Sequence, residues 1–232
     1  MTEINAKLLG LPETLNDDLL SRAIAHQIQI QRYGEGVSNQ IVELLEQSEA
    51  DLVKKLRNRL DKIEARGFDL GPATTQRVRN LIVGTGEIVD NRYSKVYGTL
   101  KDEMVELAQS EAKYQIGEIE DAVGVTLEME LPAANQLRSI VTAQPFEGAV
   151  MSQWAKKLAA SEKESIGQAV RLGLAQGETT EQIVQGLTSK GGGIFKSKAN
   201  ARAYTRTAVN HVSTHARVAV HQENSSLIKG EQ

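Results

Sequence analysis

The C-terminal part of this sequence holds the side chains whose types and spacing best suit binding chemistry. Residues 182–222 contain no Asp or Glu. The same stretch carries six cationic side chains, which we take as candidate contacts for double-stranded DNA or for an acidic protein surface: Lys190, Lys196, Lys198, Arg202, Arg206 and Arg217. Lysine and arginine neutralise phosphates without reading the base sequence, so these groups predict a non-specific, salt-sensitive interaction.

Charge is unevenly distributed along the chain. The sequence has 27 Lys and Arg against 30 Asp and Glu, a net charge of −3. Without the six candidate cations, the remainder has 21 basic residues against 30 acidic ones, a net charge of −9. Such asymmetry is typical of a surface for nucleic acid or for an acidic partner. The alternative interpretation is a solvated helix face that lacks acids.

Two histidines are the strongest candidates for a metal site. His211 and His215 are four residues apart, a spacing that can place two imidazoles on one metal ion. No Glu directly follows His211, and the spacing marks no third ligand. The serines and threonines form no recognisable triad, and the glycines at 191–193 lack the strand and the lysine of a phosphate-binding loop. We therefore predict no metal, no cofactor and no enzymatic activity.

Cysteine usage and hydropathy exclude further classes of site. The chain has no cysteine, which excludes a disulfide framework and thiolate metal sites. Its N-terminus lacks the basic region and apolar run of a signal peptide. No apolar stretch approaches the roughly 20 residues that a membrane span needs. We expect a soluble protein made in a cytoplasm.

A helix must position the candidate cations. The pattern of small apolar residues predicts a final helix over residues 197–222. Lys198, Arg202 and Arg206 recur every four residues and would form one ridge on this helix. Arg217 follows Arg206 by eleven residues, about three turns, and would lie close to the same face.

Two long apolar stripes dominate the N-terminal half. Their members recur at helical spacing: Ile41, Leu45, Leu52, Leu56, Leu60 and Ile63 in the first, and Val89, Tyr93, Val96, Leu100, Met104 and Leu107 in the second. We predict that glycines at 34–36 and 84–86 interrupt the helices and that Gly67 ends the first. A turn at Gly71 and Pro72 would join them in an antiparallel hairpin. Alternatively, each stripe is a coiled-coil surface for a partner.

The C-terminal half predicts shorter elements. Residues 123–131 alternate apolar and polar side chains, which favours a strand. A short helix is expected at 133–142, a longer one from about residue 148 to Gly177, and a third at 180–187, opened by a capping box of Thr179 and Gln182. We predict two parts, residues 1–132 as a long-helix hairpin region and 133–232 as a helical domain.

Composition favours an all-α fold. Only 4% of residues are aromatic, and aromatic side chains dominate thick globular cores. The abundance of Leu, Ile, Val, Ala, Glu, Gln and Lys suits thin layers of helices instead. We therefore predict an elongated bundle of long helices and helical hairpins with a small C-terminal helical domain.

Residues 164–223 resemble the Mu F-like phage head-morphogenesis family, whose members are also called minor head or minor capsid proteins. The similarity begins with IGQAVRLGLAQGETTEQIVQGL and ends with ARAYTRTAVNHVSTHARVAV. The family motif has an Arg-Thr pair and a second Arg eleven positions later, which Arg206, Thr207 and Arg217 match here. The family usually has Glu after the pair, where this chain has Ala208, and an Asn before the second Arg, where it has Thr214.

The resemblance implies a minor structural protein of a bacteriophage head. Such a protein would join the head interior or portal vertex during assembly in the host cytoplasm, and would assist head assembly, DNA packaging or DNA delivery. Its expected partners are the portal protein, other head proteins and double-stranded DNA, with no membrane contact in the head and an oligomeric state in the virion. The alternatives are an internal DNA-ejection protein that forms an oligomeric conduit, or a non-virion nucleic-acid-binding helical protein.

Overall fold

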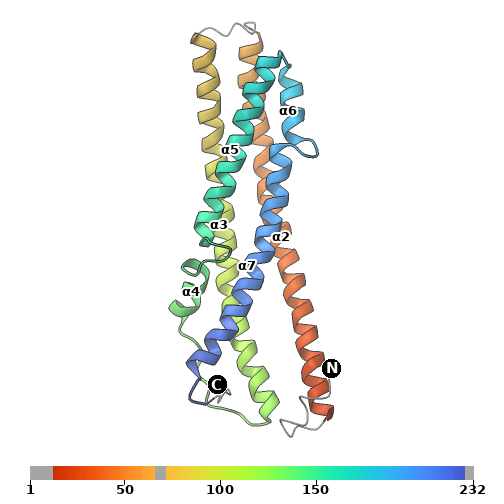
Figure 1. The fold of residues 1–232 in the computed structure, drawn as a ribbon, viewed down its shortest axis with the longest axis vertical. Coiled ribbons are helices and arrows are strands. Elements are labelled where there is room, and N and C mark those ends of the chain that lie inside the picture. Colours follow the sequence, from red (N-terminus) through yellow and green to blue (C-terminus); the bar gives the residue numbers. More distant parts are fainter. Residues whose placement is uncertain (1–12, 66–71, 228–232) are drawn as a thin grey trace. The chain divides into compact units, whose positions relative to one another are not determined.

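The computed structural model describes residues 13–65 and 72–227, and every regular element in these ranges is an α-helix. The helices are α2 (Glu13–Glu64), α3 (Pro72–Val123), α4 (Ala134–Thr142), α5 (Met151–Gln176), α6 (Thr180–Thr188) and α7 (Gly193–Glu223). Figure 1 shows their order along the chain. The predicted all-α fold with long helices is confirmed.

Helix α2 contains the first apolar stripe and buries all of it. The six stripe residues are at most 2% exposed: Ile41, Leu45, Leu52, Leu56, Leu60 and Ile63. The predicted interruption at residues 34–36 is wrong, because α2 continues through them. Gly34 is buried close to Val209 of α7. A helical glycine costs only about 1 kcal/mol, which apolar packing of Ile30 and Val37 on either side offsets.

Helix α3 contains the second stripe, and here too the predicted interruption at residues 84–86 is wrong. Gly84 is buried beside the guanidinium of Arg59, and the Thr85 hydroxyl donates to the Leu81 carbonyl at 2.9 Å. Both residues are therefore accommodated inside the helix. The residues predicted to end α2 and to turn into α3, Gly67 and Gly71, lie outside the described ranges.

The predicted strand at 123–131 is also wrong. Helix α3 extends to Val123, and residues 124–133 form no regular element. The described residues offer this segment no partner strand, and an isolated strand is unstable. Some of its backbone N–H groups bind side chains instead: the Leu127 N–H donates to Glu120, and the Glu130 N–H donates to the Asn224 side chain.

The predicted helical elements of the C-terminal half are confirmed. Helix α5 ends at Gly177, which adopts the left-handed conformation with φ of 72°. Thr179 and Gln182 form the expected capping box at the start of α6. Helix α7 begins at Gly193, four residues before the predicted start.

The described chain divides into two compact units that do not follow the predicted boundary at residue 132. Unit 1 combines residues 1–36, 103–144 and 206–232, and unit 2 combines residues 37–102 and 145–205. Each unit therefore takes segments from both halves of the sequence.

Antiparallel pairing of α2 and α3 is visible within each unit. In unit 1, Tyr33 contacts Glu103 and His26 contacts Glu111. The earlier residue of α2 therefore contacts the later residue of α3, as in an antiparallel pair. In unit 2, Arg92 donates to the Leu45 carbonyl and Arg59 to the Asn80 carbonyl, with the same relation. The predicted helical hairpin is confirmed.

Candidate functional site: the basic side chains of helix α7

In unit 2, two candidate cations of α7, Lys198 and Arg202, are held against α2. The Lys198 ammonium lies 2.9 Å from a carboxylate oxygen of Glu49 and 3.5 Å from one of Glu46. Arg202 donates to the Asn39 side chain at 3.2 Å. The Lys198 side chain is only 22% exposed. These cations therefore join two helices instead of facing solvent freely.

In unit 1, Arg206 forms an ion pair with Glu35 of α2. This hydrogen bond and the nearby carboxylate charge raise the pKa of Arg206 above its ordinary value. Both side chains are more than half exposed, so the pair stabilises the fold weakly. Thr207, the other half of the matched pair, is only partly exposed.

Arg217 belongs to a buried network around Glu111 of α3. Its Nε and Nη2 lie 2.8 and 2.7 Å from Glu111 Oε2. The Ser213 hydroxyl donates to the same oxygen at 2.7 Å, and His26 Nε2 lies 2.8 Å from the other oxygen. The His26 ring stacks on Tyr114 with 3.4 Å between ring centroids. The Glu111 side chain is 2% exposed, so one carboxylate links α2, α3 and α7 inside unit 1.

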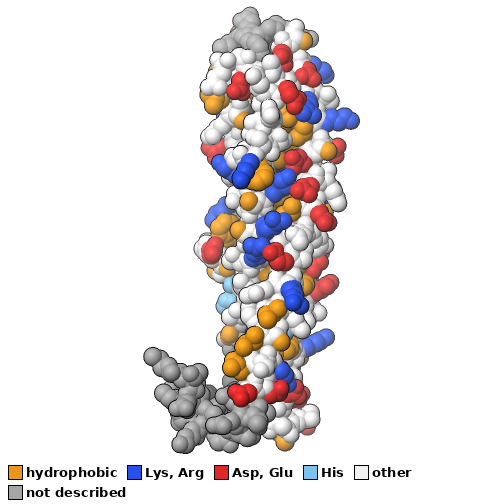
Figure 2. Space-filling model, turned by 90° about the vertical axis from the view of Figure 1, so that its right-hand side faces the viewer, with side chains coloured by type: hydrophobic (Ala, Val, Ile, Leu, Met, Phe, Trp, Pro, Cys, Tyr) orange, Lys and Arg blue, Asp and Glu red, His pale blue; other side chains and the backbone are white. Residues whose placement is uncertain are grey.

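Two of the six candidate cations are both exposed and without an ion pair in the described part of the chain. Lys190 and Lys196 are exposed and form no ion pair with any described carboxylate. The predicted ridge has helical spacing, but its members differ in their partners: within unit 1, Arg206 contacts α2 and Arg217 contacts α3. On the face drawn in Figure 2, Lys and Arg side chains lie among Asp and Glu side chains. The pairing of Arg206 and Arg217 with carboxylates weakens the case for extensive DNA contact through α7.

His211 and His215 lie together as their spacing predicts, with 4.3 Å between ring centroids. Burial and the neighbouring His215 lower the pKa of His211 below its ordinary value. Within residues 13–65 and 72–227, no group of three or more His, Cys, Asp or Glu side chains could hold a metal ion.

A buried ion pair in unit 2 has no counterpart in the sequence-based predictions. Arg92 Nη1 lies 2.8 Å from Glu162 Oε1, and both side chains are at most 1% exposed. Arg92 also donates to the Leu45 carbonyl at 3.2 Å. Burial raises the pKa of Glu162, while the Arg92 charge acts in the opposite direction. The periodicity contains no signal for this pair, because Arg92 and Glu162 are 70 residues apart.

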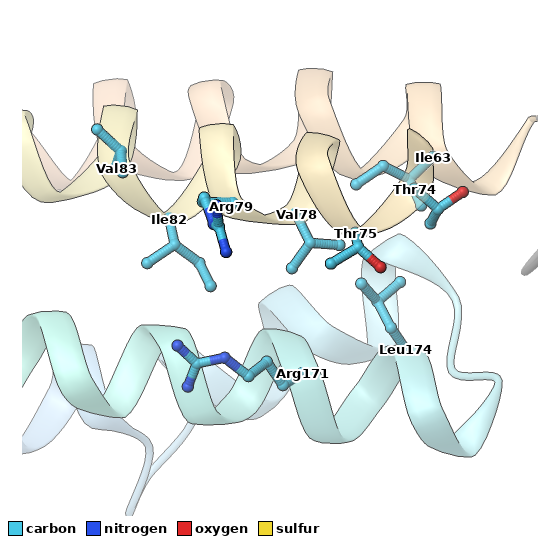
Figure 3. A pocket seen from close by; sticks show the side chains of 9 residues that line it. All are labelled: Ile63, Thr74, Thr75, Val78, Arg79, Ile82, Val83, Arg171 and Leu174. Carbon is cyan, nitrogen blue, oxygen red and sulfur yellow. The ribbon is translucent and has the colours of Figure 1, made fainter. Parts of the chain in front are cut away.

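An apolar groove in unit 2 is likewise absent from those predictions. It lies between α3 and α5 and has a volume of about 440 Å³. Its apolar lining comes from Ile63, Val78, Ile82, Val83 and Leu174 (Figure 3). Among these lining residues Val83 is 58% exposed, and Val78 and Ile82 are half-buried. The groove therefore leaves apolar surface open to solvent.

Two arginines lie on opposite walls of this groove, Arg79 on α3 and Arg171 on α5 (Figure 3). Neither forms an ion pair with a carboxylate in the described part of the chain. The wall segments, residues 72–86 and 165–177, contain no Asp or Glu. Some other cations of unit 2 have acidic partners, as Arg57 has Glu181 and Lys163 has Asp90, whereas Lys190 and Lys196 have none among the described residues. The groove is thus apolar at its floor and positively charged at its edges.

Comparison with known proteins adds no relative: no family model matches the chain, and neither a curated protein nor a solved structure is significantly similar to it. Among the described residues, no helix is both long and apolar enough to cross a bilayer.

Proposed function

We propose that this chain is a minor structural protein of a bacteriophage head, associated with the portal vertex, that docks onto another head protein through the groove between α3 and α5. The observation that carries the docking role is the pair of arginines without acidic partners beside an open apolar floor. The virion assignment is supported by the resemblance of residues 164–223 to the Mu F-like family.

The chemistry of the groove favours one kind of occupant. Apolar floors bind the apolar face of an amphipathic helix, and Arg79 and Arg171 on the two walls suit carboxylates that flank such a face. Nucleic acid fits the groove less well, because its charged phosphates make no favourable contact with the apolar side chains of Val78, Ile82 and Leu174. We therefore propose an acidic, amphipathic helix of the portal or of a neighbouring head protein as the partner.

Helix α7 then has mainly an internal role. Lys198, Arg206 and Arg217 have carboxylate partners on α2 or α3. Lys190 and Lys196 are free to make accessory contact with packaged DNA. A few lysines give a weak interaction that salt removes.

The test is co-sedimentation with portal rings encoded by the same phage and, separately, with double-stranded DNA, across a salt series. Portal binding is expected to survive at high salt, because the groove contact is largely apolar, whereas DNA binding is lost. The double variant Arg79→Glu/Arg171→Glu should weaken portal binding at least about tenfold. Lys190→Glu, an exposed charge reversal in the same unit but outside the groove, should leave portal binding unchanged.

Each other outcome has a definite meaning. Binding to neither portal nor DNA at low salt would contradict the proposal. DNA binding alone would favour the nucleic-acid-binding alternative. Portal binding that the groove variant does not affect would retain the vertex assignment and exclude the groove as its docking site.

A further inference from the structure

The exposed surface of α2 over residues 19–31, in unit 1, is chemically unlike that over residues 40–64. Between residues 19 and 31, nine side chains are exposed and none is charged: Leu20, Ser21, Ala23, Ile24, Ala25, Gln27, Ile28, Gln29 and Gln31. Between residues 40 and 64 of the same helix, eleven are exposed and seven are charged: Glu43, Glu46, Asp51, Lys54, Arg57, Asp61 and Lys62, with Gln40, Gln47, Ala50 and Asn58 uncharged. Solvated helix faces normally carry charge, so residues 19–31 have the composition of a contact surface.

Three large aliphatic side chains form the centre of this face. Leu20, Ile24 and Ile28 are 58%, 53% and 43% exposed and recur every four residues, so they lie in one row along α2. The charged side chains in between point elsewhere. Arg22 pairs with Asp18, Glu118 and Asp121, and His26 contacts Glu111.

Opposite charges stand at the two ends of the row. Asp17 is seven residues before Ile24, on nearly the same side of the helix, and Arg32 is one turn beyond Ile28. Both are exposed, and neither forms an ion pair with a described residue. The face is therefore negative at its N-terminal end, apolar in the middle and positive at its C-terminal end.

We infer that this face binds the same face of a second copy of the chain, with the two α2 helices antiparallel about a two-fold axis at Ile24. In this register Ile24 meets Ile24 of the other copy, and Leu20 meets its Ile28. Asp17 comes within reach of Arg32 of the other copy, and symmetry forms this ion pair twice. In the same register Gln27 lies opposite Ser21 of the other copy and Gln31 lies opposite its Asp17, and a glutamine amide can hydrogen-bond to either partner.

Charge selects this arrangement over the alternatives. A parallel pair would place Asp17 against Asp17 and Arg32 against Arg32, which is unfavourable. A foreign acidic or basic partner would find only one end complementary. The contact spans about 16 residues of helix, roughly 24 Å, which is small for a protein interface. We therefore expect a weak dimer, populated at high protein concentration. This inference does not depend on the proposed virion function.

The first test measures self-association of the full chain by sedimentation velocity over a wide concentration range. A monomer–dimer equilibrium is expected. Ile24→Lys places two like charges on the axis and should weaken dimerisation at least about tenfold. The control Gln47→Lys introduces the same charge on the charged part of α2 and should have no effect. A chain that stays monomeric at every concentration would overturn the inference.

Charge exchange tests the orientation. Asp17→Arg and Arg32→Asp should each weaken the dimer, because each creates like-charged contacts. The double variant restores both ion pairs with reversed polarity and should recover most of the wild-type affinity. Failure of the double variant to recover affinity would exclude the antiparallel register.

Disulfide trapping tests the register independently, and the absence of native cysteine makes single-cysteine variants unambiguous. Under mild oxidation, Ile24→Cys should form a symmetric disulfide-linked dimer. Leu20→Cys and Ile28→Cys should crosslink when mixed but not alone, and Gln47→Cys should not crosslink. Efficient crosslinking of Leu20→Cys with itself would indicate a parallel pair and would refute the antiparallel arrangement.

Discussion

At the scale of single residues, unit 1 depends on one carboxylate. Glu111 accepts hydrogen bonds from Arg217 and Ser213 and contacts His26, while only 2% of its side chain is exposed. A buried carboxylate is tolerated only where donors surround it. Removing the charge of Glu111 would therefore leave the Arg217 guanidinium without its counter-ion.

Glu111→Gln should destabilise the protein by about 3 kcal/mol, because it leaves the partly buried Arg217 guanidinium without its counter-ion. Urea denaturation followed by circular dichroism measures the change. Glu106→Gln, an exposed substitution on the same helix, should change the free energy of unfolding by less than about 0.5 kcal/mol. Equal stability of the two variants would show that the network contributes little.

His211 predicts a dependence of stability on pH. Its pKa is lowered in the folded protein from an ordinary value of 6.5, mainly by burial and also by His215. The unfolded chain therefore binds more protons as the pH falls through this range, and the folded state loses stability there. Denaturation midpoints measured at about pH 5 and pH 8 should differ less in His211→Gln than in the wild type. An unchanged difference would exclude His211 as its source.

At the scale of the helices, the effect of a glycine on helix structure depends on where it lies and on what packs against it. The sequence predicts that the glycines at 34–36 and 84–86 interrupt helices, but α2 and α3 continue through both. Gly177 does end α5, because its φ of 72° is readily adopted by glycine. Gly173 has a third role: a Cβ added there would lie 2.5 Å from Ile183 Cγ1, so it permits close packing of α5 on α6.

Two alanine substitutions should therefore have opposite effects. Gly36 is exposed inside α2 with no atom within 4 Å of an added Cβ. Gly36→Ala should stabilise the protein by about 0.5–1 kcal/mol through higher helix propensity. Gly173→Ala should destabilise it by about 1–3 kcal/mol, because α6 must shift. Thermal denaturation compares the two, and a gain in stability from both would contradict the close packing of α5 and α6.

At the scale of the whole molecule, each compact unit is assembled from distant parts of the chain. Unit 1 takes three segments and unit 2 takes two, and both draw on residues before and after 132. In unit 2, for example, Lys198 pairs with Glu49, which is 149 residues away. Neither half of the sequence contains a complete unit.

Fragments 1–132 and 133–232 should therefore fold poorly when produced separately and should associate when combined. The expected signs are broad thermal transitions for each fragment and a single sharper transition for the mixture, measured by circular dichroism. Trp154, the only tryptophan, packs against Phe146 and Tyr204 in unit 2 and provides a fluorescence signal for that unit. Cooperative unfolding of fragment 133–232 alone would instead support the predicted boundary.

Elements with local signals can be predicted from the amino-acid sequence without the fold. The apolar stripes of α2 and α3, the cap at Gly177 and the capping box of Thr179 and Gln182 are of this kind, because each depends on residues within a few turns of one helix. The i to i+4 spacing likewise places His211 beside His215.

The roles of the charged residues, in contrast, follow from tertiary packing. The spacing of Arg206 and Arg217 predicts a shared face, but their partners, Glu35 and Glu111, lie 171 and 106 residues away. No local pattern encodes such distances, because a partner is chosen by which helices pack together and in what register. The same reason explains why glycines of α2 and α3 are tolerated, why the predicted strand is absent, and why the arginine-lined groove is found only in the folded chain.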